Sequence, residues 1–229
     1  MYRTSFMTCF EQFYGPPSAY RILALLPGYL ERADSSLVYM VRALMEASAH
    51  PDNGFYLNEF EALNALLQKP CDRHTLLIGV SFALLDFAER HPAHLPHTTI
   101  METGGMKGRR EEITRGELHQ LLQAAFGLDG IHSEYGMTEL LSQAYAKKEG
   151  RFHCPPWMRI GIRELNDPLS PAEEGRSGAI NVTDLANMYS CSFIATSDLG
   201  RRAVDGSFEV LGRVDYSDTR GCNLMVAEP

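Results

Sequence analysis

Apolar runs alternate with helix-forming segments through the first two thirds of the chain, and this alternation does most to limit the possible folds. The runs 21–26 and 74–80 are almost continuously apolar, which is typical of strands buried on both faces. The segments 35–49 and 81–89 place apolar residues at helical spacing. Strands and helices that alternate over short connections form parallel βαβ units with right-handed crossovers. The sequence therefore predicts an α/β fold, with a mostly parallel sheet and helices on both faces.

Additional strands and two capping boxes complete this series. Strands are expected at 54–57, 97–103 and 131–135. A capping box pairs an Asn, Ser or Thr at a helix start with a Glu three residues later. Asn58 and Thr114 are each followed by such a Glu. They predict helices at 58–68 and 114–126.

The pattern changes after residue 150. Short β-like runs at 158–165, 178–185, 192–196 and 207–211 are separated by Gly, Pro, Asp and Asn. Such runs, without helical periodicity, predict a smaller antiparallel β region packed beside the parallel sheet. We therefore divide the chain into an α/β part, residues 1–150, and a β-rich part, residues 151–229.

Composition excludes several classes of protein. The 229 residues are 45% hydrophobic and 22% charged, as in an ordinary globular protein. A net charge of −8 argues against a nucleic-acid scaffold, which would present a basic face. The longest apolar runs, 22–27 and 76–80, are far shorter than the roughly 20 residues of a membrane helix. The N-terminus has no secretory pattern, so we expect a cytoplasmic protein with no membrane span and no nucleic-acid partner.

The cysteines do not form a recognisable pattern. Five are present, namely Cys9, Cys71, Cys154, Cys191 and Cys222. Their number is odd and no two are spaced for a zinc knuckle or a redox pair. Reduced thiols in a reducing compartment are the simplest interpretation.

The stretch 130–139 carries the densest chemistry. We interpret it as a strand that breaks at Gly136 into a helix-forming segment, a junction whose free N–H groups suit an anion. Gly136 allows close backbone approach to a ligand. Tyr135 could lie on a base, Thr138 could bond a phosphate oxygen and Glu139 could hold a divalent cation. The alternative is a polar turn that only caps a helix.

Further polar and glycine residues fall at turns after predicted strands. Gly104 and Gly105 follow the strand 97–103, at the carboxyl edge where ligands of parallel sheets bind. Asp198 is expected at a turn after a β run, where its carboxylate could accept two ribose hydroxyls. Its alternative role is turn formation. Arg213 would be a cation near a phosphate or ribose, or a surface ion pair of little energetic value.

Taken in order, these motifs resemble those of the adenylate-forming (ANL) superfamily. They are Gly-Gly (104–105), Tyr-Gly-x-Thr-Glu (135–139), Thr-x-Asp-Leu-Gly (196–200) and Gly-Arg-x-Asp (212–215). The superfamily includes acyl-CoA synthetases, peptide-synthetase adenylation domains and firefly luciferase. The ending 218–224 is similar to the LuxE-like branch, the acyl-protein synthetases of bacterial bioluminescence and related acyl transferases. The resemblance runs from about Phe10 to Val226 and implies the N-terminal domain fold of the superfamily.

The resemblance implies an AMP-forming acid–thiol ligase that uses ATP and Mg²⁺ to activate a fatty or other acyl carboxylate. The thiol acceptor would be CoA or a protein cysteine. The residues it assigns to the nucleotide are Gly104, Gly105, Met106, Tyr135, Gly136, Met137, Thr138, Asp198 and Arg213. Thr138 and Glu139 are its catalytic candidates, and Glu139 would bind Mg²⁺. Cys222 is the candidate acyl acceptor, and the alternative is an unreactive, partly buried thiol.

Two family features are missing from this sequence. No Ser/Thr- and Gly-rich phosphate loop precedes the first predicted strand, and no C-terminal lid with a catalytic lysine follows. The alternative function is therefore a catalytically incomplete nucleotide- or acyl-binding module, or one half of a split enzyme. A homodimer would cover apolar surface that a missing segment leaves exposed.

Overall fold

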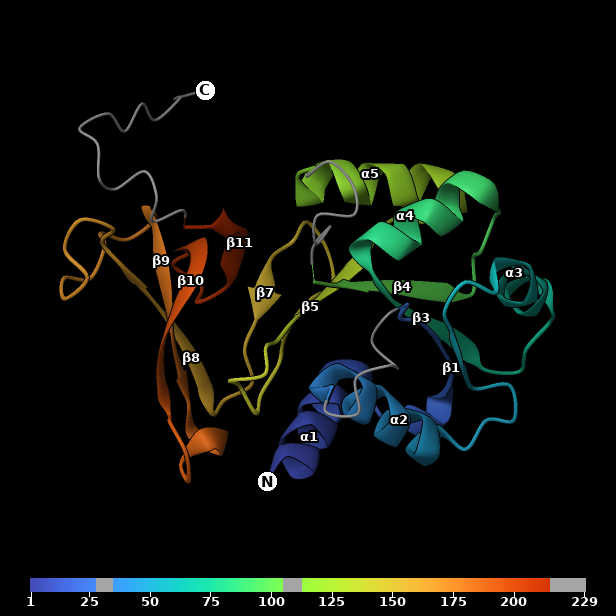
Figure 1. The fold of residues 1–229 in the computed structure, drawn as a ribbon, viewed down its shortest axis with the longest axis horizontal. Coiled ribbons are helices and arrows are strands. Elements are labelled where there is room, and N and C mark those ends of the chain that lie inside the picture. The colour runs from blue at the N-terminus through green and yellow to red at the C-terminus, as the bar shows by residue number, and fades with distance from the viewer. Residues whose placement is uncertain (28–34, 105–112, 215–229) are drawn as a thin grey trace.

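The computed structural model describes residues 1–27, 35–104 and 113–214, which build one continuous sheet of 11 strands (Figure 1). The helices are α1 (Tyr2–Tyr14), α2 (Ser36–Ser48), α3 (Phe60–Gln68), α4 (Ser81–Arg90) and α5 (Arg115–Phe126), with short 3₁₀ turns η1 (Pro17–Ala19) and η2 (Leu185–Asn187). The first strands are β1 (Tyr20–Leu25), β2 (Gly54–Tyr56), β3 (His74–Val80), β4 (Thr98–Thr103), β5 (His132–Tyr135) and β6 (Ala144–Ala146). The remaining strands are β7 (Phe152–His153), β8 (Met158–Arg163), β9 (Ser177–Asp184), β10 (Phe193–Arg202) and β11 (Phe208–Arg213).

The parallel half of the sheet follows the predicted βαβ pattern. Strands β2, β1, β3, β4 and β5 lie side by side in that order, and all their pairings are parallel. Helices α1 and α2 cover one face, whereas α4 and α5 cover the other (Figure 1). The central strands β1 and β3 are buried along almost their whole length, which explains their continuous apolar sequence. The predicted α/β fold class is confirmed.

The antiparallel half continues the same sheet and does not pack beside it. Strand β5 pairs with β6 in antiparallel fashion, and the order then runs β7, β11, β10, β9 and β8. This half has its own apolar cluster, which includes Phe152, Ile160, Ile180 and Phe208. The predicted division at residue 150 stays a prediction. No helix in the described parts of the chain is long and apolar enough to cross a membrane.

Helix α1 has no counterpart in the sequence prediction. It buries Phe6, Cys9 and Phe10, which recur at helical spacing and form one apolar face. Trp157 ties this helix to later parts of the chain, because its indole N–H donates to Ser5 Oγ at 3.2 Å and to Ser142 Oγ at 2.9 Å. Helix α1 therefore supports both halves of the sheet.

The two predicted capping boxes have opposite outcomes. Thr114 and Glu117 form the expected reciprocal cap of α5, with the Thr114 hydroxyl accepting from the Glu117 N–H. The Asn58 cap is wrong, because the N-cap residue of α3 is Glu59. The Glu59 carboxylate accepts the N–H groups of Leu57 and Asn58 at 2.8 and 3.1 Å. The carboxylate of Glu59 thus accepts the backbone N–H groups that precede the helix.

Candidate functional site

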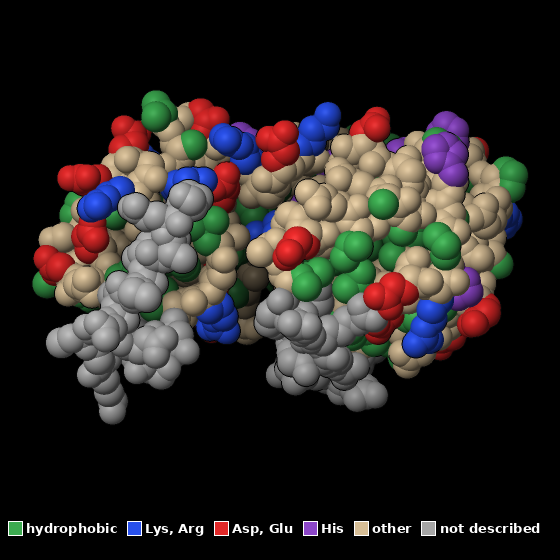
Figure 2. All heavy atoms as spheres, turned by 90° about the horizontal axis from the view of Figure 1, so that it is seen from above, with side chains coloured by type: hydrophobic (Ala, Val, Ile, Leu, Met, Phe, Trp, Pro, Cys, Tyr) green, Lys and Arg blue, Asp and Glu red, His purple; other side chains and the backbone are tan. Residues whose placement is uncertain are grey.

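A large open cleft lies between the carboxyl ends of the parallel strands and the hairpin β10–β11. Its volume is 1690 Å³, larger than the roughly 300–1,000 Å³ of typical ligand pockets. Seen from above, the surface is hollowed between the two halves of the molecule (Figure 2). The cleft therefore lies where an α/β fold places its ligands.

The structure brings most of the predicted site residues to this cleft. Those that line it are Gly104, Tyr135, Gly136, Met137, Thr138, Glu139, Asp198 and Arg213. Gly105, Met106 and Cys222 lie outside the described residues. The loop 135–139 and Asp198, about 60 residues apart in sequence, thus line the same cleft.

A direct contact joins three of these residues. The Tyr135 hydroxyl donates to Asp198 Oδ2 at 2.8 Å, and Arg213 Nε lies 3.8 Å from Asp198 Oδ1. The Tyr135 ring is 7% exposed and packs edge-to-face against Phe152 and Phe208. Burial, followed by the Asp198 charge, raises the pKa of the Tyr135 hydroxyl, so it stays a donor. The contact fixes the Asp198 carboxylate at the cleft wall.

The strand position of Asp198 corrects the expected turn. Strand β10 continues through Asp198 to Arg202, with a register shift against β9 between Ala195 and Leu199. Arg213 stands opposite Asp198 in the β10–β11 pairing. The irregularity turns this part of β10 out of the regular ladder, as β-bulges near sites commonly do.

No helix follows Gly136, so the predicted strand-to-helix junction is wrong. The chain turns between β5 and β6, and the buried Asp184 carboxylate captures its backbone. Asp184 Oδ2 accepts from Leu141 N at 2.9 Å and from Ser142 N at 3.0 Å. The Asn187 amide donates to the Glu139 carbonyl at 2.6 Å. The loop that carries Thr138 and Glu139 is therefore held by side chains from β9 and η2, and it does not begin a helix.

Both Thr138 and Glu139 present exposed side chains to the cleft. A carboxylate oxygen such as that of Glu139 is the kind of ligand that Mg²⁺ prefers. A hydroxyl such as that of Thr138 can donate a hydrogen bond to a phosphate oxygen. The donor set at this loop therefore fits a nucleotide with its magnesium ion.

Beside this loop, Glu134 is a buried acid that the sequence analysis did not single out. It is 7% exposed, and Thr103 Oγ1 donates to its Oε2. Burial raises the pKa of the Glu134 carboxyl to about 7, which outweighs the opposing effect of the Thr103 hydrogen bond. A Cβ at residue 136 would overlap Glu134 Oε1, so any larger residue there would have to displace this carboxylate.

Arg115 and Glu102 form a second missed pair at the cleft. Arg115 Nε donates to Glu102 Oε1 at 2.8 Å, and Arg115 Nη1 donates to the Val210 carbonyl at 2.9 Å. Burial disfavours the Glu102 anion, but the His119 hydrogen bond and the Arg115 charge prevail and lower its pKa. An acid inside the apolar strand 97–103 was the sequence signal for this pair.

The described fold is similar to that of several solved ligases. The ATP-bound structure of MatB from Rhodopseudomonas palustris matches with a TM-score of 0.67 and 15% identity, over 90% of this chain and 42% of that one. Coronafacic acid ligase from Pectobacterium brasiliense matches with a TM-score of 0.54 and 19% identity, over 86% of this chain and 40% of that one. A malonyl-CoA ligase in a ternary product complex with methylmalonyl-CoA and AMP matches with a TM-score of 0.55 and 18% identity, over 84% and 44%.

The described part of the chain shares its fold with the corresponding part of these structures. It spans less than half the length of these ligases. No protein-family model matches the sequence, and no curated protein matches it. The fold expected from the four motifs is thus confirmed, whereas the LuxE-like branch stays a prediction.

Proposed function

We propose that the cleft binds ATP and activates an acyl carboxylate as its acyl-adenylate, which a thiol then takes up. The main support is the convergence of residues 135–139, Asp198 and Arg213 on one cleft of a fold shared with adenylate-forming ligases. One similar structure holds ATP, and another holds AMP with methylmalonyl-CoA. The nucleotide, the acyl substrate and the CoA or protein acceptor are assigned to this chain only as parts of the proposal.

Asp198 is the proposed ribose ligand. A carboxylate has about four lone-pair sites, and the Tyr135 hydroxyl occupies one of them. The remaining sites can accept the two ribose hydroxyls. Arg213 would approach the ribose or phosphates from the same side, since it lies within 3.8 Å of Asp198.

Tyr135 is the proposed adenine platform. The part of its ring that lines the cleft is the surface available for stacking. Its hydroxyl keeps the ring in place through Asp198, so base and ribose contacts would be set by one hydrogen bond. Gly104, Gly136 and Met137 would border the same nucleotide, together with Gly105 and Met106.

Thr138 and Glu139 are proposed to act at the phosphates. Thr138 would donate its hydroxyl to a phosphate oxygen, and Glu139 would hold Mg²⁺. A bound magnesium ion would neutralise phosphate charge during the displacement. The side chains of this chain supply orientation and fixed charge, which is most of what such a reaction requires.

Adenylation solves a chemical problem for the acyl carboxylate. Direct attack by a thiol would have to expel oxide, which is a very poor leaving group. In the proposed reaction a carboxylate oxygen attacks the α-phosphorus of ATP, and pyrophosphate departs with the electron pair of the broken P–O bond. The thiolate then attacks the acyl carbon and expels AMP. Cys222 stays the candidate protein acceptor.

Pyrophosphate exchange tests the proposal. The chain should exchange labelled pyrophosphate into ATP only when a carboxylic acid is present. Glu139→Ala should lower this exchange by about 10²–10³, which is typical for the loss of one electrostatic element. The matched control is Glu173→Ala, an exposed acid outside the cleft, and it should exchange normally.

Calorimetry with ATP and AMP separates this proposal from its alternative. Asp198→Ala should weaken both ligands, because both carry the ribose. Equal exchange by Glu139→Ala and wild type would reject the role of Glu139. AMP binding without any carboxylate-dependent exchange would instead favour the nucleotide-binding module.

A further inference from the structure

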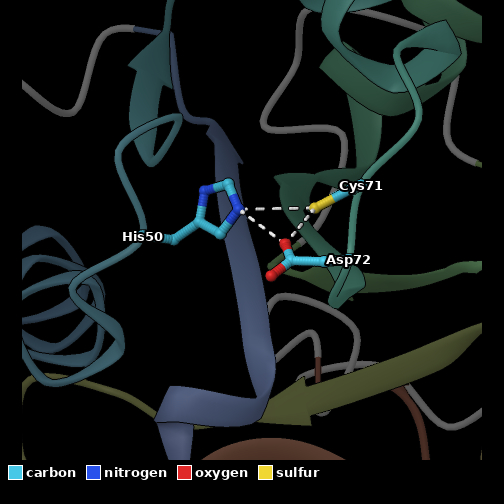
Figure 3. A group of neighbouring side chains, drawn as sticks. All are labelled: His50, Cys71 and Asp72. Atoms are coloured by element: carbon cyan, nitrogen blue, oxygen red, sulfur yellow. Dashed lines mark hydrogen bonds and ion pairs between the residues drawn. The ribbon is translucent and has the colours of Figure 1, made fainter.

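A cluster of three ligand-type side chains lies away from the cleft (Figure 3). His50 belongs to the loop between α2 and β2, whereas Cys71 and Asp72 belong to the loop between α3 and β3. Both loops precede parallel strands, so the cluster lies at the amino edge of the sheet, opposite the edge that carries the cleft. The proposed nucleotide chemistry does not use these residues.

The ligand atoms form a nearly equilateral triangle. His50 Nε2 lies 3.4 Å from Cys71 Sγ and 3.7 Å from Asp72 Oδ1, and the thiol lies 3.8 Å from the same carboxylate oxygen. Tetrahedral zinc with ordinary bond lengths to sulfur, nitrogen and oxygen separates such ligands by about 3.3–3.6 Å. The triangle thus matches one face of a zinc tetrahedron within a few tenths of an ångström.

We propose that His50, Cys71 and Asp72 form a zinc site with water as the fourth ligand. A thiolate and a carboxylate together balance the charge of Zn²⁺, and imidazole is its commonest nitrogen ligand. The His50 side chain is 7% exposed and fixed, whereas Asp72 is 83% exposed and leaves one side open to water. Three protein ligands and an open position are a known zinc arrangement.

The imidazole tautomer sets the cost of binding. His50 Nδ1 accepts the Asp52 N–H at 3.1 Å, so the neutral ring of the metal-free chain carries its proton on Nε2, toward Cys71. Zinc at Nε2 moves that proton to Nδ1, which then faces the Asp52 N–H, so the hydrogen bond between them is lost. Losing this hydrogen bond costs roughly one to two orders of magnitude in affinity. Structural zinc sites have affinities of about 10⁷–10¹¹ M⁻¹, so the cost is tolerable.

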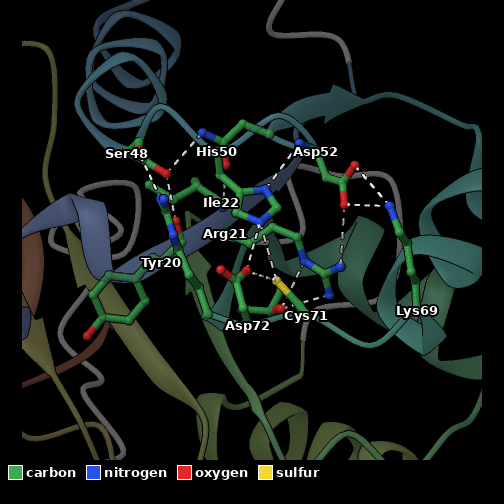
Figure 4. A network of polar contacts seen from close by, with 12 residues as sticks. Tyr20, Arg21, Ile22, Ser48, His50, Asp52, Lys69, Cys71 and Asp72 are labelled. Atoms are coloured by element: carbon green, nitrogen blue, oxygen red, sulfur yellow. Dashed lines mark hydrogen bonds and ion pairs between the residues drawn. The ribbon is translucent and has the colours of Figure 1, made fainter.

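Neighbouring charges define which acid is the ligand (Figure 4). Asp52 is engaged by Lys69 at 3.0 Å and lies 4.0 Å from the buried Arg21 guanidinium. Its charge is therefore already compensated. Among the described residues Asp72 has no Lys or Arg within ion-pair distance and faces only the His50 imidazole, which makes it the acid available to a metal.

Zinc would join the two loops that enter β2 and β3. Binding releases the Cys71 thiol proton, because zinc binds the thiolate, whereas the imidazole proton moves to Nδ1 and stays on the ring. The bonds formed are Zn–S, Zn–N and Zn–O, and no electron is transferred. Affinity should therefore rise with pH.

Cobalt and zinc titrations test the site. Reduced, metal-free chain should bind one Co²⁺ with a thiolate-to-cobalt charge-transfer band, and one Zn²⁺ should displace it with a Kd of about 1 μM or tighter. Cys71→Ser should remove the band, and Asp72→Asn should weaken zinc at least tenfold. The matched control is Cys191→Ser, which changes an exposed cysteine in the β9–β10 connection and should bind normally. A band that survives Cys71→Ser would overturn the proposal, as would the absence of any band.

Nitrogen NMR of the imidazole reports the tautomer of His50. This tautomer would not change with zinc if Cys71 had only a structural role. Zinc should shift the His50 proton from Nε2 to Nδ1 in wild type, but not in Cys71→Ser. Saturating zinc should also raise the Tm of wild type by about 5 °C, with no rise in Cys71→Ser. An unchanged His50 tautomer at saturating zinc would overturn the assignment even if zinc binds elsewhere.

Discussion

Two buried glutamates at the cleft, Glu102 and Glu134, have carboxyl pKa values that shift in opposite directions. Glu102 and Glu134 stand on neighbouring strands β4 and β5, and both line the cleft. The hydrogen bond from His119 and the charge of Arg115 lower the pKa of the Glu102 carboxyl and favour its anion. Glu134 is held by the Thr103 hydroxyl, and burial raises its pKa to about 7. The two acids thus differ in charge state near neutral pH.

Glu134→Gln should stabilise the protein at pH 8 but not at pH 4. The carboxyl pKa rises from 4.5 to about 7 on folding, so the folded state keeps a proton that the unfolded chain loses. Stability from this group therefore falls as pH rises through that interval, by about 3 kcal/mol in total. Glutamine carries no charge to bury and keeps an oxygen for Thr103.

Urea unfolding at the two pH values measures this effect. The control is Glu117→Gln, whose carboxyl pKa is lowered by the Thr114 hydrogen bonds. That substitution should cost stability at pH 8 and little at low pH, which is the opposite sign. Equal effects of Glu134→Gln at both pH values would contradict the buried-acid interpretation.

At the scale of elements, apolar runs predicted the buried parallel strands and helical spacing predicted α2 and α4, because each buries its own face, whereas α3 and α5 were predicted from capping motifs. The same reasoning failed for residues 137–142, since Thr-Glu-Leu-Leu favours a helix locally. Asp184, more than 40 residues later, captures the N–H groups of Leu141 and Ser142 that a helix would have used. Such a long-range acceptor is invisible to local propensity.

The candidate site could likewise be predicted where it depends on local motifs, but not where it depends on long-range contacts. Its loops were recognised from short motifs, but the Arg115–Glu102 pair depends on how α5 crosses β4. The zinc triangle has the same origin, because His50 and Cys71 are 21 residues apart and meet only through the βαβ fold. Residue spacing within one loop cannot predict a ligand set to which two different loops contribute.

Asp184→Asn should destabilise the protein by about 3 kcal/mol, because buried donors that faced a carboxylate then face an amide. The loop with Thr138 and Glu139 should loosen, and ATP affinity should fall. The control is Asp205→Asn, an exposed turn acid that also accepts from a following serine, Ser207. Its expected cost is small, because substitutions of exposed side chains rarely destabilise a protein. Chemical denaturation and calorimetry measure both variants, and equal losses would contradict the prediction.

At the scale of the whole molecule, the described residues form two apolar clusters around one continuous sheet. Between β7 and β11 the paired position is Phe208 opposite Phe152. Arg115 reinforces this junction, since it donates to the Val210 carbonyl and its guanidinium lies 5.1 Å from the Phe152 ring centre. One side chain from the parallel half thus supports the antiparallel half.

Arg115→Lys should speed amide hydrogen exchange in β10 and β11 and leave β1 and β3 unchanged. Lysine keeps a charge for Glu102 but cannot also reach the Val210 carbonyl with a second donor. Hydrogen exchange followed by mass spectrometry measures each strand. Arg73→Lys is the control, because Arg73 donates to the Ser48 carbonyl within the parallel half. Faster exchange throughout the sheet would mean general destabilisation instead.

The narrow β7–β11 pairing has a mechanical consequence. Tyr135 rests against both Phe152 and Phe208, the two residues that make this pairing. These three rings all belong to the apolar cluster of the antiparallel half, so the two walls of the cleft cannot shift against each other without disturbing packed core. Because Tyr135 also lines the cleft, a ligand that contacts its ring would touch the same packed rings that join the two halves of the sheet.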